Sequence, residues 1–385
     1  MLRIFKIIQG DKAIWTVVII LSIFSVLAVY SSTGTLAYKY QSGNTEYYLF
    51  KHLGILIMGL ISMYLAHLIK YTYYAKIAQI GIILVIPLLF YTLFFGTSLN
   101  EATRWIILPI INLTIQTSDI GKLILLMYVA RLLSKKQDEI KDLKSAFIPI
   151  ILPILIVCGL ILPANFSTAA ILFVTSLILL FIGRIKIKYI LAIIGIGIVF
   201  LSLFILIIVY STDNKGRIQT WENRIESYIN GDSESNYQTE QAKIAIARGG
   251  IIGKFPGKST QRNFLPHPYS DFIFAIIIEE YGLIGGMVIV LMYLIILYRG
   301  VQIVKQCPGT FGAFLTIGVC ISLVFQAFVN MAVAVNLLPV TGQPLPLVSM
   351  GGTSIWFTSL SIGIMLSVSK GIMKEKPENQ RHATA

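Results

Sequence analysis

Charged side chains inside otherwise apolar segments are the first candidates for chemistry in this sequence. Asp119 and Lys122 stand three residues apart in one such segment. In a helix this spacing puts both on one face, where they can pair. Either they form a structural ion pair, or Lys122 faces a polar cavity and binds an anionic group such as a phosphate. Arg104, which precedes Trp105 just before this segment, is either an interfacial anchor or a phosphate ligand.

Three carboxylates belong to a later apolar segment. Asp271 follows the proline-containing stretch 264–270 and stands where the segment begins. It is either a helix-start acid or a general base at the mouth of a cavity. Glu279 and Glu280 lie about two helical turns deeper, and adjacent residues point in different directions. Two acids at this depth could also form a proton or cation relay, which keeps a transporter open as an alternative.

The elements that must position these residues are membrane helices. Of 385 residues, 56% are hydrophobic and only 13% are charged, and the mean hydropathy is +0.79. This composition excludes a soluble enzyme, a disordered protein and a coiled coil, and it predicts an all-α polytopic membrane protein. Ten transmembrane helices are predicted, at about 13–31, 50–69, 77–97, 117–133, 146–162, 167–183, 188–210, 271–297, 310–335 and 351–369. The fifth and sixth are separated by a turn at 163–167, where Pro163 interrupts the helix.

The distribution of charge predicts the orientation. The N-terminus, the alternate loops on its side and the C-terminal tail together balance to +13, whereas the opposite loops balance to +3 and the spans to −3. By the positive-inside rule both termini are cytoplasmic. The net charge of +13 therefore reports topology, and nucleic acid is not an expected partner.

The remaining organisation is a single membrane domain over 1–385, with a large extracytoplasmic loop at 211–270 between helices seven and eight and a short cytoplasmic tail at 371–385. A surface helix is predicted over 238–248. The glycines that follow it predict a flexible, anion-friendly backbone. The uncharged loop 337–353 predicts irregular backbone that re-enters the membrane edge.

Several kinds of site are not expected. The three cysteines and four histidines are scattered and give neither a disulfide framework nor a metal-ligand spacing. No glycine-rich nucleotide loop is present, which argues against an ATP-driven pump.

Taken together, these segments resemble the SEDS family (shape, elongation, division and sporulation), which includes FtsW, RodA and SpoVE. The resemblance extends along most of the chain. The matching motifs are Ala102–Ile106, Gln116–Lys122, Phe264–Phe274, Glu279–Gly282, Leu338–Pro346 and Ser349–Ser354, with Arg217, Trp221, Arg224 and Gln238 in the long loop. Three positions depart from the family pattern: Asp119 replaces a usual Glu, Asn165 a usual Asp, and Met350 a usual Tyr. A carboxylate role at position 165 therefore cannot be carried over.

The resemblance implies a peptidoglycan glycosyltransferase that polymerises undecaprenyl-linked lipid II on the outer face of the bacterial cytoplasmic (inner) membrane. It implies a class B penicillin-binding protein, a transpeptidase, as partner, together with other membrane proteins of the division machinery. The residues at 261–266 and 330–344 resemble the division branch (FtsW) more than the elongation branch (RodA), so the expected location is the division septum.

The same resemblance assigns roles. Asp271 is the expected catalytic base, which deprotonates the acceptor 4-hydroxyl for attack on the donor's anomeric carbon, and a single displacement inverts that carbon. The expected residues of the lipid II pyrophosphate site and its cavity are Arg104, Asp119, Lys122, Arg217, Glu280 and Ser349. A divalent cation, Mg or Mn, could assist the leaving group, although no dedicated metal-ligand cluster is visible. The alternatives are an elongation polymerase, a lipid II flippase or proton-coupled carrier, and a noncatalytic scaffold.

Overall fold

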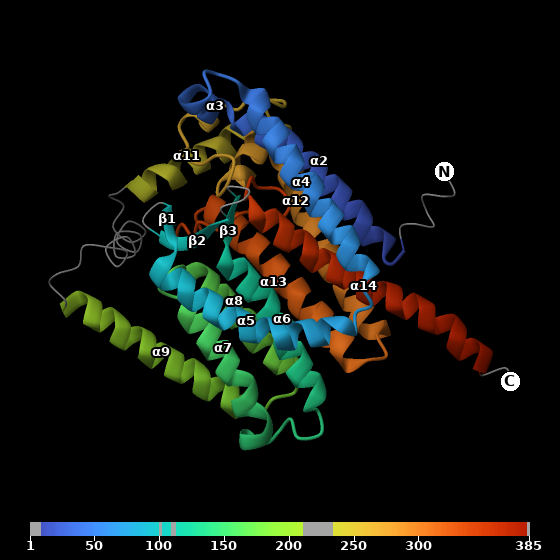
Figure 1. Ribbon diagram of the computed structural model, residues 1–385. Helices are drawn as coiled ribbons and strands as arrows, with labels where there is room; N and C mark the ends of the chain where they lie inside the picture. The colour runs from blue at the N-terminus through green and yellow to red at the C-terminus, as the bar shows by residue number, and fades with distance from the viewer. Residues whose placement is uncertain (1–8, 100–101, 109–112, 211–233, 383–385) are drawn as a thin grey trace.

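The computed structural model describes residues 9–99, 102–108, 113–210 and 234–382, and these are mostly helical (Figure 1). One helix lies over each of the ten predicted segments. They are α2 (Lys12–Ser32), α4 (Thr45–Leu68), α5 (Tyr73–Phe95), α6 (Thr117–Lys135), α7 (Ile148–Ile161), α8 (Phe166–Ile182), α9 (Ile187–Tyr210), α12 (Ile273–Gln306), α13 (Thr310–Ala334) and α14 (Thr353–His382). A π-helical turn, η1 (Leu143–Phe147), leads into α7.

Seven helices in the described part of the chain are long and apolar enough to cross a membrane. The other three are α6, which carries Asp119, Lys122 and Arg131, and α8 and α9, whose described apolar stretches are shorter. The chain is therefore a multi-pass helical membrane protein, and the count of ten spans stays a prediction.

Side-chain caps define where several helices begin. Asp11 accepts hydrogen bonds from the backbone N–H groups of Ala13 and Ile14 at the start of α2. Asn165 does the same for α8, accepting from the Thr168 N–H at 3.2 Å. The predicted turn at 163–167 is thus confirmed. Asn165 caps the helix as Asp would, because either side chain offers an acceptor oxygen.

The centre of the bundle is α13. About 72% of its most apolar window is buried, against 28% for α4 and for α5. It packs against α6, α8, α12 and α14, while α4 lies along α14 and α5 along α6 (Figure 1). Helix α9 lies at the edge of the bundle beside α8 (Figure 1).

A small antiparallel sheet, which the sequence analysis did not predict, precedes α6. Its strands are β1 (Thr97–Leu99), β2 (Ala102–Leu108) and β3 (Leu113–Gln116), in the order β1-β2-β3. Trp105 pairs with Gln116, the residue directly before α6. The β-branched and aromatic residues of β2 favour a strand over an irregular loop. The sheet lies at the same end of the bundle as α3 (Gly34–Tyr40) and α11 (Glu234–Gly249) (Figure 1).

Helix α12 is interrupted at Gly282, which has φ +70° and ψ −173°. The chain after α11 enters this break: the N–H groups of Leu283 and Ile284 donate to the carbonyls of Gly250 and Ile251, at 2.9 and 3.3 Å. A Cβ on Gly282 would come within 2.1 Å of the Ile251 carbonyl oxygen, so only glycine fits here.

The glycines after α11 correct one expectation. The helix predicted over 238–248 is confirmed as α11. Of the glycines at its end and after it, Gly249 and Gly253 pack tightly, whereas a Cβ at Gly250 or Gly257 would meet nothing within 4 Å. Cβ atoms at Gly249 and Gly253 would come within 2.1 and 2.3 Å of the carbonyl oxygens of Ile278 and Glu280. Gly249 and Gly253 therefore allow the backbone at the end of α11 and just after it to approach the backbone of α12 closely.

Candidate functional site

Asp271 lies at the mouth of the bundle, two residues before α12 begins at Ile273. It was predicted to open the span, and the structure places it in the turn that precedes the helix. Its carboxylate accepts a hydrogen bond from Ser270 Oγ at 2.8 Å. Gly342 lies over the other carboxylate oxygen, since a Cβ at that glycine would be 3.7 Å from Oδ2. At this distance a Cβ would be in ordinary van der Waals contact with the carboxylate, so Gly342 packs directly beside Asp271.

The loop between α13 and α14 holds Asp271 in place. Asn330 Nδ2, on α13, donates to the Asp271 carbonyl at 2.9 Å and to the Gln343 carbonyl at 2.7 Å. The loop is irregular, as predicted, and its second half contains buried residues: Val348 and Ser349 are 0% and 1% exposed. An amide on a membrane helix thus connects two segments that carry the predicted signature motifs.

Ser349 contacts the same turn. Its hydroxyl donates to the Ser270 carbonyl at 2.6 Å and accepts the Leu345 N–H at 2.7 Å. The Met350 N–H donates to the Tyr269 carbonyl at 2.9 Å. Ser349 was predicted as a substrate-binding residue; the contacts give it a positioning role beside Asp271, and direct contact with a substrate stays a prediction.

Tyr269 belongs to this turn as well. Its pKa is raised, first by burial and then by the negative charge of Asp271. The phenol is therefore neutral over the physiological range, and its hydroxyl shares a hydrogen bond with His267 Nδ1 at 3.2 Å.

Asp119 and Lys122 line a small, partly open pocket between α6, α13 and α14, with about 20 Å³ of free volume. Lys122 Nζ is 3.6 Å from Asp119 Oδ1 and donates to Gln326 Oε1 at 2.7 Å. Asp119 is 5% exposed, and its Oδ2 has no hydrogen-bond partner among the described residues. The predicted pairing is confirmed, and both residues also line the pocket, whereas binding of an anionic group by Lys122 stays a prediction. Hydroxyl groups of Ser322, Ser354, Thr358 and Ser361 also line it.

Helix α13 connects the pocket to Asp271. Gln326 Nε2 donates to the Pro344 carbonyl at 3.0 Å, and Asn330, one turn further along the same face, donates to Asp271 and Gln343. Lys122 and Asp271 are thus bonded to amides on consecutive turns of one helix, and the same two amides donate to consecutive residues of the loop between α13 and α14. Sequence reasoning missed Gln326 and Asn330, although an amide inside an apolar segment is a signal of buried polar contact.

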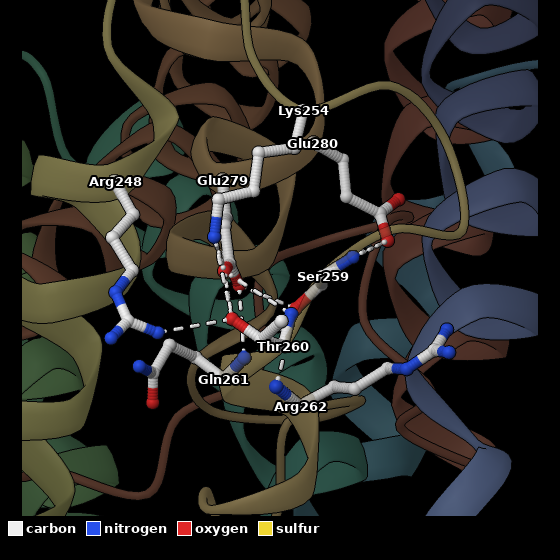
Figure 2. A network of polar contacts seen from close by, with 8 residues as sticks. All are labelled: Arg248, Lys254, Ser259, Thr260, Gln261, Arg262, Glu279 and Glu280. Atoms are coloured by element: carbon white, nitrogen blue, oxygen red, sulfur yellow. Dashed lines mark hydrogen bonds and ion pairs between the residues drawn. The ribbon is translucent and has the colours of Figure 1, made fainter.

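Glu279 and Glu280 diverge, as their adjacency predicted (Figure 2). Glu279 is 0% exposed and accepts hydrogen bonds from Lys254 and from the 259–261 segment. Glu280 accepts from the hydroxyl of Ser31, on α2, and from the Ser259 N–H at 3.3 Å. Neither acid lines the pocket described above. The prediction of Glu280 as a substrate ligand has no support from these contacts, which join it to neighbouring parts of the protein.

Two predicted arginines cannot be joined to this site. The backbone of Arg104 lies in β2, next to Trp105. Arg217 lies outside the described residues, together with Trp221 and Arg224. Their predicted roles stay predictions.

The described residues also bear on metal binding. Among them, no group of three or more His, Cys, Asp and Glu side chains could hold a metal ion. The protein residues of the described part thus do not fit a dedicated divalent-cation site, and no step below is assigned to one.

Comparison with known proteins gives consistent matches over nearly the whole chain. A family model described as "Cell cycle protein", for FtsW, RodA and SpoVE, matches residues 11–373. The chain is 34% identical over 379 residues to the probable peptidoglycan glycosyltransferase FtsW of Geobacter metallireducens, covering 96% of each chain.

Two solved structures share the fold. Rod shape determining protein RodA of Thermus thermophilus superposes with a TM-score of 0.67 at 21% identity, covering 94% of this chain and 96% of that one. A chain from a structure titled for the coordination of polymerization and crosslinking by a peptidoglycan synthase complex superposes with a TM-score of 0.68 at 22% identity, covering 94% and 97%. A family match that extends from the start of α2 to the middle of α14 shows that this protein belongs to the family of FtsW, RodA and SpoVE.

Proposed function

We propose that this protein is a peptidoglycan glycosyltransferase that polymerises lipid II into glycan strands. Its family membership and its relatives named as peptidoglycan glycosyltransferases support this assignment. The single observation that carries the chemistry is that Lys122 and Asp271 are hydrogen-bonded to amide side chains on adjacent turns of α13. This arrangement offers a carboxylate in the turn before α12 and a cation in the adjoining pocket. Glycosyl transfer to a hydroxyl needs both: a base for the hydroxyl proton and a positive charge beside the leaving group.

The reaction that fits this geometry is a single displacement. Asp271 accepts the proton of the acceptor sugar's 4-hydroxyl as that oxygen bonds to the anomeric carbon of the donor. The bond from that carbon to the pyrophosphate oxygen breaks, and the undecaprenyl pyrophosphate leaves with both electrons. One displacement inverts the anomeric centre. Lys122 offsets the charge that develops on the leaving group, and Arg104 and Arg217 are further candidates for this role.

The proposed topology places this site on the outer side. Ten spans with both termini in the cytoplasm put the sheet, α11 and Asp271 at the extracytoplasmic end. The loop between helices seven and eight, about 211–270, is then outside the cell. The charge balance of +13 on the opposite side supports this orientation.

The proposed partner is a class B penicillin-binding protein, which crosslinks the strands that this protein makes. The similarity to a chain of a peptidoglycan synthase complex supports a partnership of this kind. Other division proteins and a septal location are proposed because the relatives are named FtsW. Midcell localisation of a fluorescent fusion is the expected result, whereas uniform sidewall localisation would favour the elongation alternative.

The function is tested by reconstitution. The purified protein is placed in liposomes with fluorescent lipid II, with and without its transpeptidase, and products are separated by gel electrophoresis. Glycan strands that a muramidase digests are the expected product.

The same liposomes test the transporter alternative, which the buried Asp119–Lys122 pair favours. Movement of lipid II across the bilayer without polymer formation, abolished in Lys122→Ala, would contradict the glycosyltransferase and support a flippase.

A further inference from the structure

Glu279 is the centre of a dense polar network at the outer end of α12 (Figure 2). Its carboxylate, which is fully buried, accepts five hydrogen bonds. The donors are Lys254 Nζ at 2.9 Å, Ser259 Oγ at 2.5 Å, the Thr260 N–H at 3.2 Å, Thr260 Oγ1 at 3.0 Å and the Gln261 N–H at 3.2 Å. A buried carboxylate is tolerated only when it is paired and hydrogen-bonded, and this one is satisfied on both oxygens.

All of these donors come from a single loop, 254–261, and none from α12 itself. The Glu279 side chain therefore makes five of the side-chain hydrogen bonds that fasten the loop to the helix, and Glu280 adds one, from the Ser259 N–H at 3.3 Å. A backbone contact reinforces the attachment: the Lys254 N–H donates to the Glu279 carbonyl at 3.0 Å. Ser259 Oγ in turn accepts a hydrogen bond from the Arg262 N–H at 3.2 Å, so the same hydroxyl also fixes the backbone at Arg262.

The fastened loop leads directly to Asp271. The N–H groups of Phe264 and Leu265 donate to the Gln261 carbonyl at 3.0 and 3.1 Å, and Leu265 is 3% exposed. The segment from 262 to 272 thus has two fixed ends. Glu279 holds the first end through 259–261, and Asn330 and Ser349 hold the second end at 270–271.

From this geometry we infer that Glu279 is a positioning residue for Asp271. It acts at a distance, by fixing the start of the segment whose end carries the catalytic carboxylate. The inference rests on the proposed function, because it assigns Asp271 as the base. Glu280 has a different part: it contacts Ser31, whose carbonyl also accepts a hydrogen bond from Arg262 Nη1 at 2.8 Å, so it joins the loop to α2.

The test is Glu279→Gln. Glutamine has the same length, but its amide replaces one acceptor oxygen with a donor that faces the hydroxyl and N–H donors of the loop. We expect kcat for lipid II polymerisation to fall about 100-fold, since a misplacement of about 1 Å at a reacting group costs this much, while KM stays within about 2-fold. Asp142→Asn is the matched control, because it makes the same carboxylate-to-amide change at an exposed helix cap far from the site. It is expected to leave kcat unchanged.

Two variants of Thr260 test whether the hydrogen bonds to Glu279, and not the bulk of the side chain, support catalysis. Thr260→Val removes the Oγ1 donor and is expected to lower kcat, whereas Thr260→Ser retains the hydroxyl and is expected to restore it. Combining Glu279→Gln with Asp271→Asn gives the sharper result. If Glu279 acts through Asp271, the double variant is no slower than Asp271→Asn alone. A further loss of about 10-fold or more in the double variant would overturn the inference, as would an unchanged kcat in Glu279→Gln.

A readout independent of activity keeps the two proposals apart. A spin label at Lys258→Cys, in a background with Cys158, Cys307 and Cys320 replaced by alanine, reports the motion of the loop. We expect the label to become more mobile in Glu279→Gln and to stay unchanged in Asp142→Asn. If the protein does not polymerise lipid II but the label responds, the proposed function fails and the anchoring stands. If the label does not respond, the anchoring fails whatever the activity.

Discussion

The role of Lys122 can be separated from its structural pairing with Asp119 by a pair of variants. Lys122→Met removes the ammonium group and retains most of the apolar stem. It also leaves Asp119, which is 5% exposed, without the cation at 3.6 Å and leaves Gln326 without its donor. Removing one partner of a buried ion pair costs about 3–5 kcal/mol, because the remaining charge is uncompensated. Since Lys122 keeps 16% of its side chain exposed, we expect the lower end of this range, about 3 kcal/mol.

The second variant restores the balance of charge. Lys122→Met combined with Asp119→Leu has no unpaired charge, so most of the lost stability should return. Activity should not return, because the cation that offsets the leaving pyrophosphate is still missing. Loss of one such group is worth about 100-fold or more in rate, or about 2.7 kcal/mol.

The assay is thermal unfolding of the detergent-solubilised variants, followed by lipid II polymerisation per mole of folded protein. The expected result is a lower Tm and no activity for Lys122→Met, and a recovered Tm with no activity for the double variant. A double variant that polymerises lipid II at the wild-type rate would show that Lys122 is only a structural partner of Asp119.

Three further predictions concern the parts that hold the site. Gly282→Ala should destabilise the outer end of α12 by more than about 1 kcal/mol, because the new Cβ would lie 2.1 Å from the Ile251 carbonyl oxygen and φ is +70°. Faster amide hydrogen exchange at 249–254 is the expected result, and unchanged exchange would contradict the prediction. Asn330→Leu should reduce kcat about 10- to 100-fold with little change in KM, because the carbonyls of Asp271 and Gln343 lose their hydrogen bonds from the Asn330 amide. A variant with normal kcat would show that these bonds do not position the base. Asn165→Ala should lower stability by about 1 kcal/mol through loss of the α8 cap, and Asn165→Asp should retain it; equal Tm values for all three proteins would refute the capping role.

The helices could be predicted from the sequence because each is a long apolar run with few charges. The boundary between the fifth and sixth helices followed from Pro163 and the turn around it, which are local signals. The sheet over 97–116 was missed for the opposite reason. Its strands are short, and their pairing depends on the packing of β2 against α5 and α6.

The break at Gly282 could not be predicted from the segment that contains it. A lone glycine in an apolar run is compatible with a continuous helix. The break exists because residues 250–251, about thirty positions earlier, supply the carbonyls that accept the N–H groups of Leu283 and Ile284. The same holds for Gly249 and Gly253, whose tight packing is visible only once α12 lies beside them.

The candidate site could be predicted in part. Asp119 and Lys122 were expected to pair on spacing alone, and they do. The link between that pair and Asp271 through Gln326 and Asn330 needed the structure, because it joins four segments that are distant in the sequence. Ser349 and Glu280 were expected to contact the substrate; the structure shows their contacts with Ser270 and Ser31, and substrate contact stays a prediction.

The central claim is that Asp271 is the base of a glycosyl transfer. The most direct measurement is the rate of lipid II polymerisation by Asp271→Asn and Asp271→Ala in liposomes with the partner transpeptidase, compared with the wild-type protein at equal folded concentration. Both variants are predicted to fold and to bind lipid II, and to lose polymerisation by about 100-fold or more, since general base catalysis contributes 10²–10⁴-fold. Full polymerisation by Asp271→Ala would contradict the claim.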